Sequence, residues 1–209
     1  MSRRAVLFDF NGTLSDDEPL MCSIFQELFA ERGRPLSTEE YYAELAGHSD
    51  PEIVRHWLGS EEPELVAEKI ARYRERAADG STVSDDAREA VRMAASEASV
   101  AIVSGAARSE VDTVLWAARL DGLISATVTA DEVERGKPDP EGYLRALELL
   151  EADAGGSIAF EDSEPGIDAA RAAGLRCVAV LGTLPAERLA RADAIVERLD
   201  ADAVRGALA

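Results

Sequence analysis

The residues of this chain that could do chemistry together are three carboxylates, a hydroxyl beside a glycine, and an ammonium group. Each follows a short apolar segment or lies in the loop GKPDP: Asp9, Ser104, Gly105, Lys137, Glu161 and Asp162. Carboxylates can hold a hard divalent cation, with backbone carbonyls and water completing its coordination. A lysine and backbone N–H groups can bind a phosphate, and a carboxylate can attack it to form an aspartyl-phosphate. The set therefore suits phosphoryl transfer, which depends on positioning and charge neutralisation.

The elements that must position these residues alternate between apolar runs and helical patterns. Apolar residues at helical spacing predict helices at 108–119, 140–150 and 164–174. The apolar runs between them show no alternation, which is typical of strands buried on both faces. They lie at 5–10, 99–103, 157–160 and 175–181, with weaker candidates at 126–129 and 194–196. Strands alternating with helices predict an α/β fold with a Rossmann-like parallel sheet, whose ligands bind beyond the carboxyl ends of the strands.

Residues 15 to about 80 break this alternation. Apolar residues recur there at helical spacing, as Leu20, Ile24 and Leu28 do, and no strand signal appears. We therefore expect about four helices between the first strand and the rest of the sheet, with 78–86 as the return linker. The predicted parts are a core, 1–14 and 81–209, and a helical insertion, 15–80.

The composition excludes several classes of protein. The 209 residues are 46% apolar and 30% charged, which is ordinary for a globular protein. The net charge of −19 repels nucleic acid and anionic lipid, so we expect neither as a partner. The N-terminus shows no signal region with a cleavage site, and no apolar run approaches membrane-spanning length, so we expect a cytoplasmic protein. Whether it is a monomer or a homodimer stays open.

Taken singly, each motif has an ordinary structural explanation. Asp-x-Asn-Gly is a common turn, Ser-Gly after a strand is usually a loop, and Lys-Pro-Asp-Pro can open a helix. Glu161-Asp162-Ser163 can cap the helix that follows it. Their order along the chain, each near a predicted strand end, favours a joint function instead.

Together these motifs resemble those of the haloacid dehalogenase-like superfamily of hydrolases. The helical insertion is similar to the cap of its β-phosphoglucomutase-like branch, and the resemblance covers nearly the whole chain. The segments that carry it are DFNGTL at 9–14, EPL at 18–20, LAGHSD at 45–50, VSG at 103–105, GKPDP at 136–140 and FEDSEPGIDAARAAG at 160–174.

The resemblance implies a Mg²⁺ site. Asp9 would be both the nucleophile and a metal ligand, and the backbone carbonyl of Asn11 would be a second ligand. Asp162 would be a third ligand, and Glu161 would hold water bound to the metal. The implied cofactor is therefore Mg²⁺.

The resemblance also implies a phosphate site. Ser104 and the amide of Gly105 would bind the phosphate, and Thr13 would support the loop. Lys137 would bridge Asp9 and the phosphate, screening the two charges as they approach. The implied partner is a small phosphorylated metabolite.

The helical insertion would close over the site and contact the rest of the substrate, through a loop that contains Gly47, His48 and Ser49. Two departures in this part argue against mutase activity. Met21 stands where the mutase branch often has a histidine, and Asp50 stands where it has a phosphate-binding arginine. An acidic side chain there opposes the second phosphate that a sugar-phosphate mutase must bind.

The main departure is Asn11, because phosphatases of the family usually have aspartate there. That aspartate protonates the leaving oxygen and then deprotonates water, whereas an amide only donates or accepts hydrogen bonds. Losing a general acid–base costs about 10²–10⁴-fold in rate. We therefore expect a slow Mg²⁺-dependent phosphatase working through an aspartyl-phosphate. The alternative is a non-hydrolysing, regulatory pseudo-phosphatase. A separate hypothesis is that Asn11, which precedes Gly12, deamidates and so restores the carboxylate.

Two further branches lack the second aspartate. The dehalogenases work without metal, but this chain keeps Glu161 and Asp162, which argues against dehalogenation. Phosphonate hydrolases use a cap lysine to form a Schiff base. The helical insertion has one lysine, Lys69, and we expect it on a solvated helix face, so phosphonate cleavage stays a distant alternative.

Overall fold

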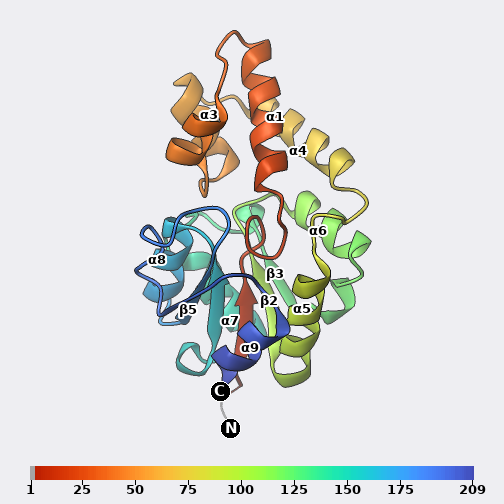
Figure 1. Ribbon diagram of the computed structural model, residues 1–209, viewed down its shortest axis with the longest axis vertical. Helices are drawn as coiled ribbons and strands as arrows, with labels where there is room; N and C mark the ends of the chain where they lie inside the picture. The colour runs from red at the N-terminus through yellow and green to blue at the C-terminus, as the bar shows by residue number, and fades with distance from the viewer. Residues whose placement is uncertain (1–2) are drawn as a thin grey trace.

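A six-stranded parallel sheet lies at the centre of the computed structural model, which describes residues 3–209 (Figure 1). The strand order is β3-β2-β1-β4-β5-β6, and every neighbouring pair is parallel. The strands are β1 Ala5–Phe8, β2 Ser99–Val103, β3 Ala126–Val128, β4 Ile158–Glu161, β5 Arg176–Val180 and β6 Ala194–Val196. Because β1 pairs with both β2 and β4, residues that follow these three strands lie side by side.

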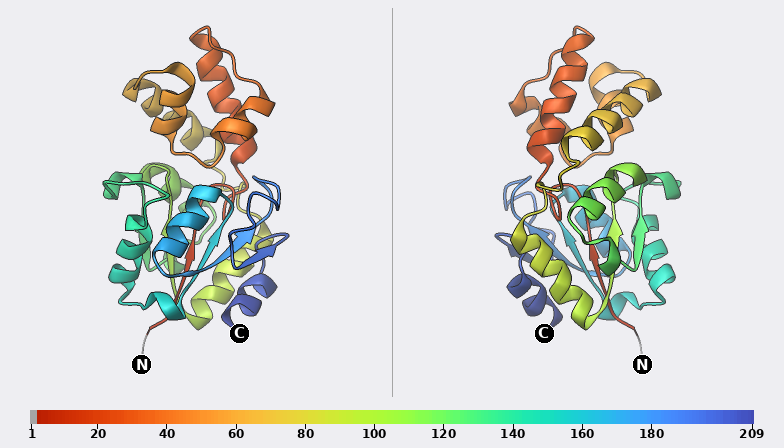
Figure 2. Two further views of the ribbon diagram at one scale, coloured as in Figure 1. Left: turned by 90° about the vertical axis from the view of Figure 1, so that its left-hand side faces the viewer. Right: turned by 90° about the vertical axis from the view of Figure 1, so that its right-hand side faces the viewer.

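Helices cover both faces of the sheet (Figure 2). Val6 and Phe8 of β1 pack on the side of α5, α6 and α9, while Ala5 and Leu7 pack on the side of α7 and α8. These helices are α5 Asp85–Glu97, α6 Arg108–Ala117, α7 Glu141–Leu150, α8 Glu164–Ala172 and α9 Ala201–Leu208. The double burial explains why the strands are continuous apolar runs in the sequence.

The helical insertion stands beyond the carboxyl end of β1 (Figures 1 and 2). Local capping shapes its short helices: Glu40 accepts from the backbone N–H of Ser37 at 2.9 Å, and Glu52 accepts from that of Ser49 at 3.0 Å. Its elements are α1 Glu18–Glu31, α2 Thr38–Glu40, the π-helix Tyr41–Leu45, α3 Asp50–Leu58 and α4 Pro63–Arg76.

The predicted fold class is confirmed, and all six predicted strands are present. No strand lies between β1 and β2 in the described chain, as expected for the helical insertion. Helices α5 and α9 were not predicted, and the expected linker 78–86 runs into the start of α5. The buried face of α5 is mostly alanine, whose side chain is small and only weakly hydrophobic, so few large apolar residues mark the helical periodicity in the sequence there. None of the described helices is long and apolar enough to cross a membrane.

Candidate active site

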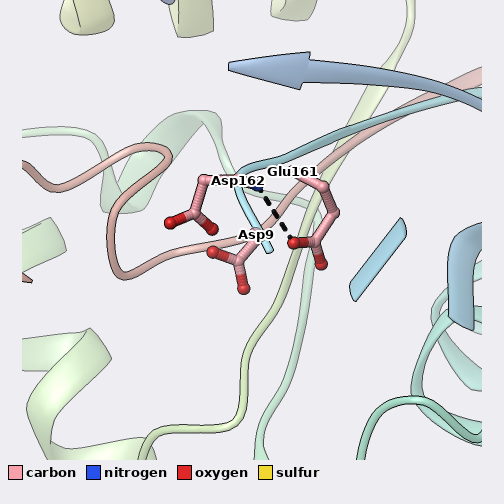
Figure 3. A group of neighbouring side chains, drawn as sticks. All are labelled: Asp9, Glu161 and Asp162. Carbon is pink, nitrogen blue, oxygen red and sulfur yellow. Dashed lines mark hydrogen bonds between the residues drawn. The ribbon is translucent and has the colours of Figure 1, made fainter. Parts of the chain in front are cut away.

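Three buried carboxylates meet where β1 and β4 end (Figure 3). Asp9 follows β1, Glu161 is the last residue of β4, and Asp162 comes next. One oxygen from each lies within 4.8 Å of the others. The pairing of β1 with β4 brings them together, and the Asp9 N–H donates to the Phe160 carbonyl at 2.9 Å.

Lys137 lies between two of these carboxylates. Its Nζ is 2.5 Å from Oδ1 of Asp9 and 2.5 Å from Oε1 of Glu161, and it donates to the carbonyl of Val103 at 3.0 Å. The hydroxyl of Tyr143 donates to the same Oε1 at 2.7 Å. The sequence showed Tyr143 only as an apolar helix position, so its contact with Glu161 was missed.

Burial shapes the charge of this cluster. It raises the pKa of Asp9 to about 7, with a further rise from Glu161 and an opposing effect of Lys137. Burial and the neighbouring Asp9 and Glu161 hold the pKa of Asp162 well above its ordinary value. Burial alone would lower the pKa of Lys137, but the charges of Asp9 and Glu161 raise it overall. The cluster thus holds more buried negative groups than its one cation balances.

Two glycines make room for the carboxylates. A Cβ on Gly12, whose φ is +74°, would lie 2.0 Å from Oδ2 of Asp162. A Cβ on Gly166 would lie 2.0 Å from a carboxylate oxygen of Glu161. The backbone therefore lets these groups converge with Asp9. Converging hard oxygen donors with excess negative charge fit a divalent cation.

A cavity of about 260 Å³ lies between the core and the helical insertion. Ser104, Gly105 and Lys137 line it on the core side, beside Asp9. The Oγ of Ser104 accepts from the N–H of Ala106 at 3.0 Å. The structure thus brings three of the four residues predicted to bind phosphate, Ser104, Gly105 and Lys137, to one wall next to the carboxylates.

Thr13 takes a different position from the other predicted phosphate residues. Its hydroxyl donates to Oδ1 of Asp162 at 3.2 Å, and it does not line this cavity. Its geometry supports a role in fixing the carboxylate rather than a direct contact with phosphate.

The predicted loop of the helical insertion reaches the cavity. Gly47, His48 and Ser49 all line it. The loop comes close to the core, since a Cβ on Gly47 would lie 2.8 Å from the Cβ of Ser163. Glu18 and Tyr41 also line the cavity from the insertion, although neither was predicted as a site residue.

The side chain of Asn11 is held by the segment that leads into the insertion. Its Nδ2 donates to Oδ2 of Asp17 at 2.9 Å, and the N–H of Gly12 donates to Oδ1 of Asp17 at 3.3 Å. The hydroxyl of Tyr73 donates to the same Asp17. Asp17 is fully buried, and burial raises its pKa. Asn11 therefore provides a donor that a carboxylate at this position would lack.

Lys69 is fully buried, so the prediction of a solvated face was wrong. Its Nζ lies 2.9 Å from Oδ2 of Asp50 in α3 and 2.9 Å from Oε1 of Glu110 in α6. Burial tends to lower the pKa of Lys69, but these two charges raise it overall. A charged amine that does not line the cavity is unsuited to Schiff-base chemistry there.

Comparison with known proteins agrees with this geometry. Residues 6–180 match the family model described as haloacid dehalogenase-like hydrolase. The chain is 30% identical to validoxylamine A 7'-phosphate phosphatase of Streptomyces hygroscopicus subsp. limoneus over 94% of both chains. It is 35% identical to protein CbbY of Rhodobacter capsulatus over 85% of both.

Solved structures agree as well. A CbbY variant from Rhodobacter sphaeroides, in complex with xylulose-(1,5)bisphosphate, superposes with a TM-score of 0.83 at 27% identity and covers 95% of both chains. The same protein in complex with phosphate superposes with a TM-score of 0.82 at 26% identity. The resemblance seen in the sequence motifs is confirmed, and this chain belongs to the haloacid dehalogenase-like hydrolase family.

Proposed function

We propose that this hydrolase is a phosphatase that cleaves phosphoric monoesters of small metabolites. The observation that carries the proposal is the cluster of Asp9, Glu161 and Asp162 with Lys137, at one wall of a cavity that the helical insertion covers. Such a set provides a nucleophile, a counter-charge and a place for a cation within reach of one ligand. Relatives described as phosphatases, such as that of Streptomyces hygroscopicus subsp. limoneus, support this reaction type.

In this proposal Asp9 attacks phosphorus and forms an aspartyl-phosphate, which water then hydrolyses. Lys137, already bonded to Asp9, neutralises charge as the phosphate approaches. Ser104 and the N–H of Gly105 bind the phosphate oxygens from the same wall. Oε1 of Glu161 holds Lys137 in place, and the hydroxyl of Tyr143, which donates to the same oxygen, fixes the position of Glu161.

We assign the cation as Mg²⁺. Asp9, Asp162 and the backbone carbonyl of Asn11 would hold it, with Glu161 in its outer shell. When bound, it neutralises phosphate charge that Lys137 alone cannot balance.

The substrate class we propose is a phosphorylated sugar or a related polyol. A phosphorylated carbohydrate phosphatase of Thermotoga maritima is 29% identical over 82% of both chains, and the CbbY complex contains a sugar bisphosphate. On the insertion side, Glu18, Asp50 and Glu52 line the cavity. These carboxylates can accept hydrogen bonds from hydroxyl groups and oppose a second phosphate.

A non-hydrolysing binding protein is the second candidate, and Asn11 is the observation that favours it. Its amide is fixed on Asp17 and has no proton to exchange at the reacting atoms. Such a protein would bind phosphate and Mg²⁺ without turnover.

The test is phosphate release from a panel of sugar phosphates, with Mg²⁺ or with a chelator. Wild type is expected to show slow, Mg²⁺-dependent release, and Asp9→Asn none. Phosphate-dependent thermal stabilisation without any release would support the binding protein instead. If neither release nor stabilisation occurs, both candidates are wrong.

A further inference from the structure

The proposed reaction needs a proton donor, and the cavity has several carboxyl groups besides the three of the cluster. Asp50 pairs with a lysine, Glu52 caps α3, Asp139 pairs with an arginine, and Glu134 is exposed. Glu18 combines two properties that none of these four has together: it is buried, with 7% of its surface exposed, and it has no ion-pair partner among residues 3–209. It is therefore the group to consider in place of Asn11.

Glu18 is the first residue of α1 and lines the cavity together with Asp9 and Asn11. Its Oε1 accepts from the hydroxyl of Tyr41 at 3.0 Å. Its Oε2 has no hydrogen-bond partner within the described chain, so the second oxygen is free to contact a ligand. Glu18 is also near enough to Asp9 and Asp162 for their charges to interact.

We propose that Glu18 is the proton donor and acceptor of the reaction, in the role that Asn11 cannot fill. This inference rests on the proposed phosphatase function. As Asp9 attacks, the bond between phosphorus and the ester oxygen breaks, and Glu18 gives its proton to that oxygen. The Glu18 carboxylate then takes a proton from the water that attacks phosphorus. The bond to Asp9 breaks, phosphate leaves, and Asp9 and Glu18 return to their starting states.

The electrostatics of Glu18 agree with this role. Burial raises its pKa to about 7, the charges of Asp17 and Asp9 add to the rise, and Tyr41 and Lys69 oppose it. An acid with this pKa can both give and take a proton near neutral pH. The titratable groups that face it from the neighbouring elements are Asp9, Asp17, Cys22, Tyr41, Tyr42, Lys69 and Asp162.

The test compares aryl phosphates whose leaving groups differ in basicity. Glu18→Gln is expected to lose about 10²–10⁴-fold in kcat/KM on phenyl phosphate, whose leaving oxygen needs a proton. On 2,4-dinitrophenyl phosphate, which needs none, the loss is expected to stay below about tenfold. Glu134→Gln is the matched control, because it removes an exposed carboxyl at the same cavity, and it should change neither value. Thermal unfolding of each variant checks folding.

A pH profile gives a second readout. Glu18 is an acid whose pKa is raised to about 7, so wild-type kcat/KM on phenyl phosphate should fall as pH rises through that value. Glu18→Gln should not show this fall. Tyr41→Phe removes a donor that lowers the pKa, so the fall should move to higher pH.

Equal losses on all aryl phosphates would make Glu18 a binding or structural residue and overturn the inference alone. The same conclusion follows if Glu18→Gln retains the fall with pH. If wild type shows no Mg²⁺-dependent turnover of 2,4-dinitrophenyl phosphate and equals Asp9→Asn, the phosphatase function itself is wrong, and the inference fails with it.

Discussion

The two lysines of this chain make the same kind of contact in different surroundings. Lys137 lies between two carboxylates, 2.5 Å from an oxygen of each, and Lys69 lies between two others at 2.9 Å. Lys137 lines the cavity with 14% of its side chain exposed, whereas the side chain of Lys69 is 0% exposed and lies away from the cavity. A cation that a ligand can reach can serve chemistry, while an enclosed one can only link the elements around it.

The enclosed lysine should have the largest effect on stability. Lys69→Met leaves Asp50 and Glu110 buried without a cation, which is expected to lower the free energy of unfolding by about 3–5 kcal/mol. Urea denaturation measures this loss, and Mg²⁺ should not reverse it. Adding Glu110→Gln to this variant should recover part of the loss by removing one of the stranded charges. A loss below about 1 kcal/mol, the range of exposed pairs, would contradict the assignment.

The accessible lysine should have the larger effect on turnover. Lys137→Met is expected to lower kcat by about 10²–10³-fold, because it removes charge neutralisation beside Asp9. Lys69→Met should keep kcat within about tenfold in conditions where it is folded. Mg²⁺-dependent release of nitrophenol from p-nitrophenyl phosphate measures both. Similar losses in the two variants would remove the distinction between the lysines.

The contact of Asn11 with Asp17 joins an accessible residue, as Lys137 is, to an enclosed one, as Lys69 is. Asn11 lines the cavity, and Asp17 is fully buried. Asn11→Asp alone sets two carboxylates against each other, so we expect lower stability and little gain in rate. Asn11→Asp with Asp17→Asn restores a donor to the contact and should raise kcat/KM on phenyl phosphate by up to about 10²-fold. A full gain from the single variant would show that the contact imposes no constraint.

The smallest expected effect is the pH dependence of stability at the enclosed cluster. Burial raises the pKa of Glu110 from 4.5 to about 7, against the opposing charge of Lys69. Neutral Glu110 therefore stabilises the fold fully below pH 4.5, and this contribution disappears as pH rises through about 7. Glu110→Gln should flatten the decline by about 1–3 kcal/mol, since one pKa unit corresponds to about 1.4 kcal/mol. Denaturation of both proteins from pH 5 to 8 tests this, and parallel declines would contradict it.

The position of the core-side residues could be predicted from the sequence for a geometric reason. Parallel strands end at one edge of a sheet, so polar residues after separate apolar runs must meet there. Asp9 and Glu161 follow this rule, and Lys137 from the loop GKPDP contacts both of them in the structure. The apolar run directly before Asp9, and the one before Glu161, were enough to place these two residues at that edge.

The insertion side could not be predicted in the same way, because its contacts join residues far apart in the chain. Lys69 stands three residues after Val66 and four before Tyr73, so helical spacing already placed it on the inner face. Its charge suggested the opposite, and its partners Asp50 and Glu110 lie on other helices. The bond of Tyr73 to Asp17 likewise spans 56 positions and leaves no local pattern.

That bond from Tyr73 to Asp17 has a consequence for how the insertion could be exchanged. Asp17 lies where the chain leaves the core, and Tyr73 lies in the last helix before it returns. The two ends of the helical insertion are therefore joined, and the pairing of Lys69 with Glu110 is its other buried polar attachment described above. A unit with adjoining ends can be replaced as a whole with little disturbance to its host. Substrate contacts and the proton transfer proposed for Glu18 could then be transplanted between relatives as one module, while Asp9, Lys137 and the cation site stay with the sheet.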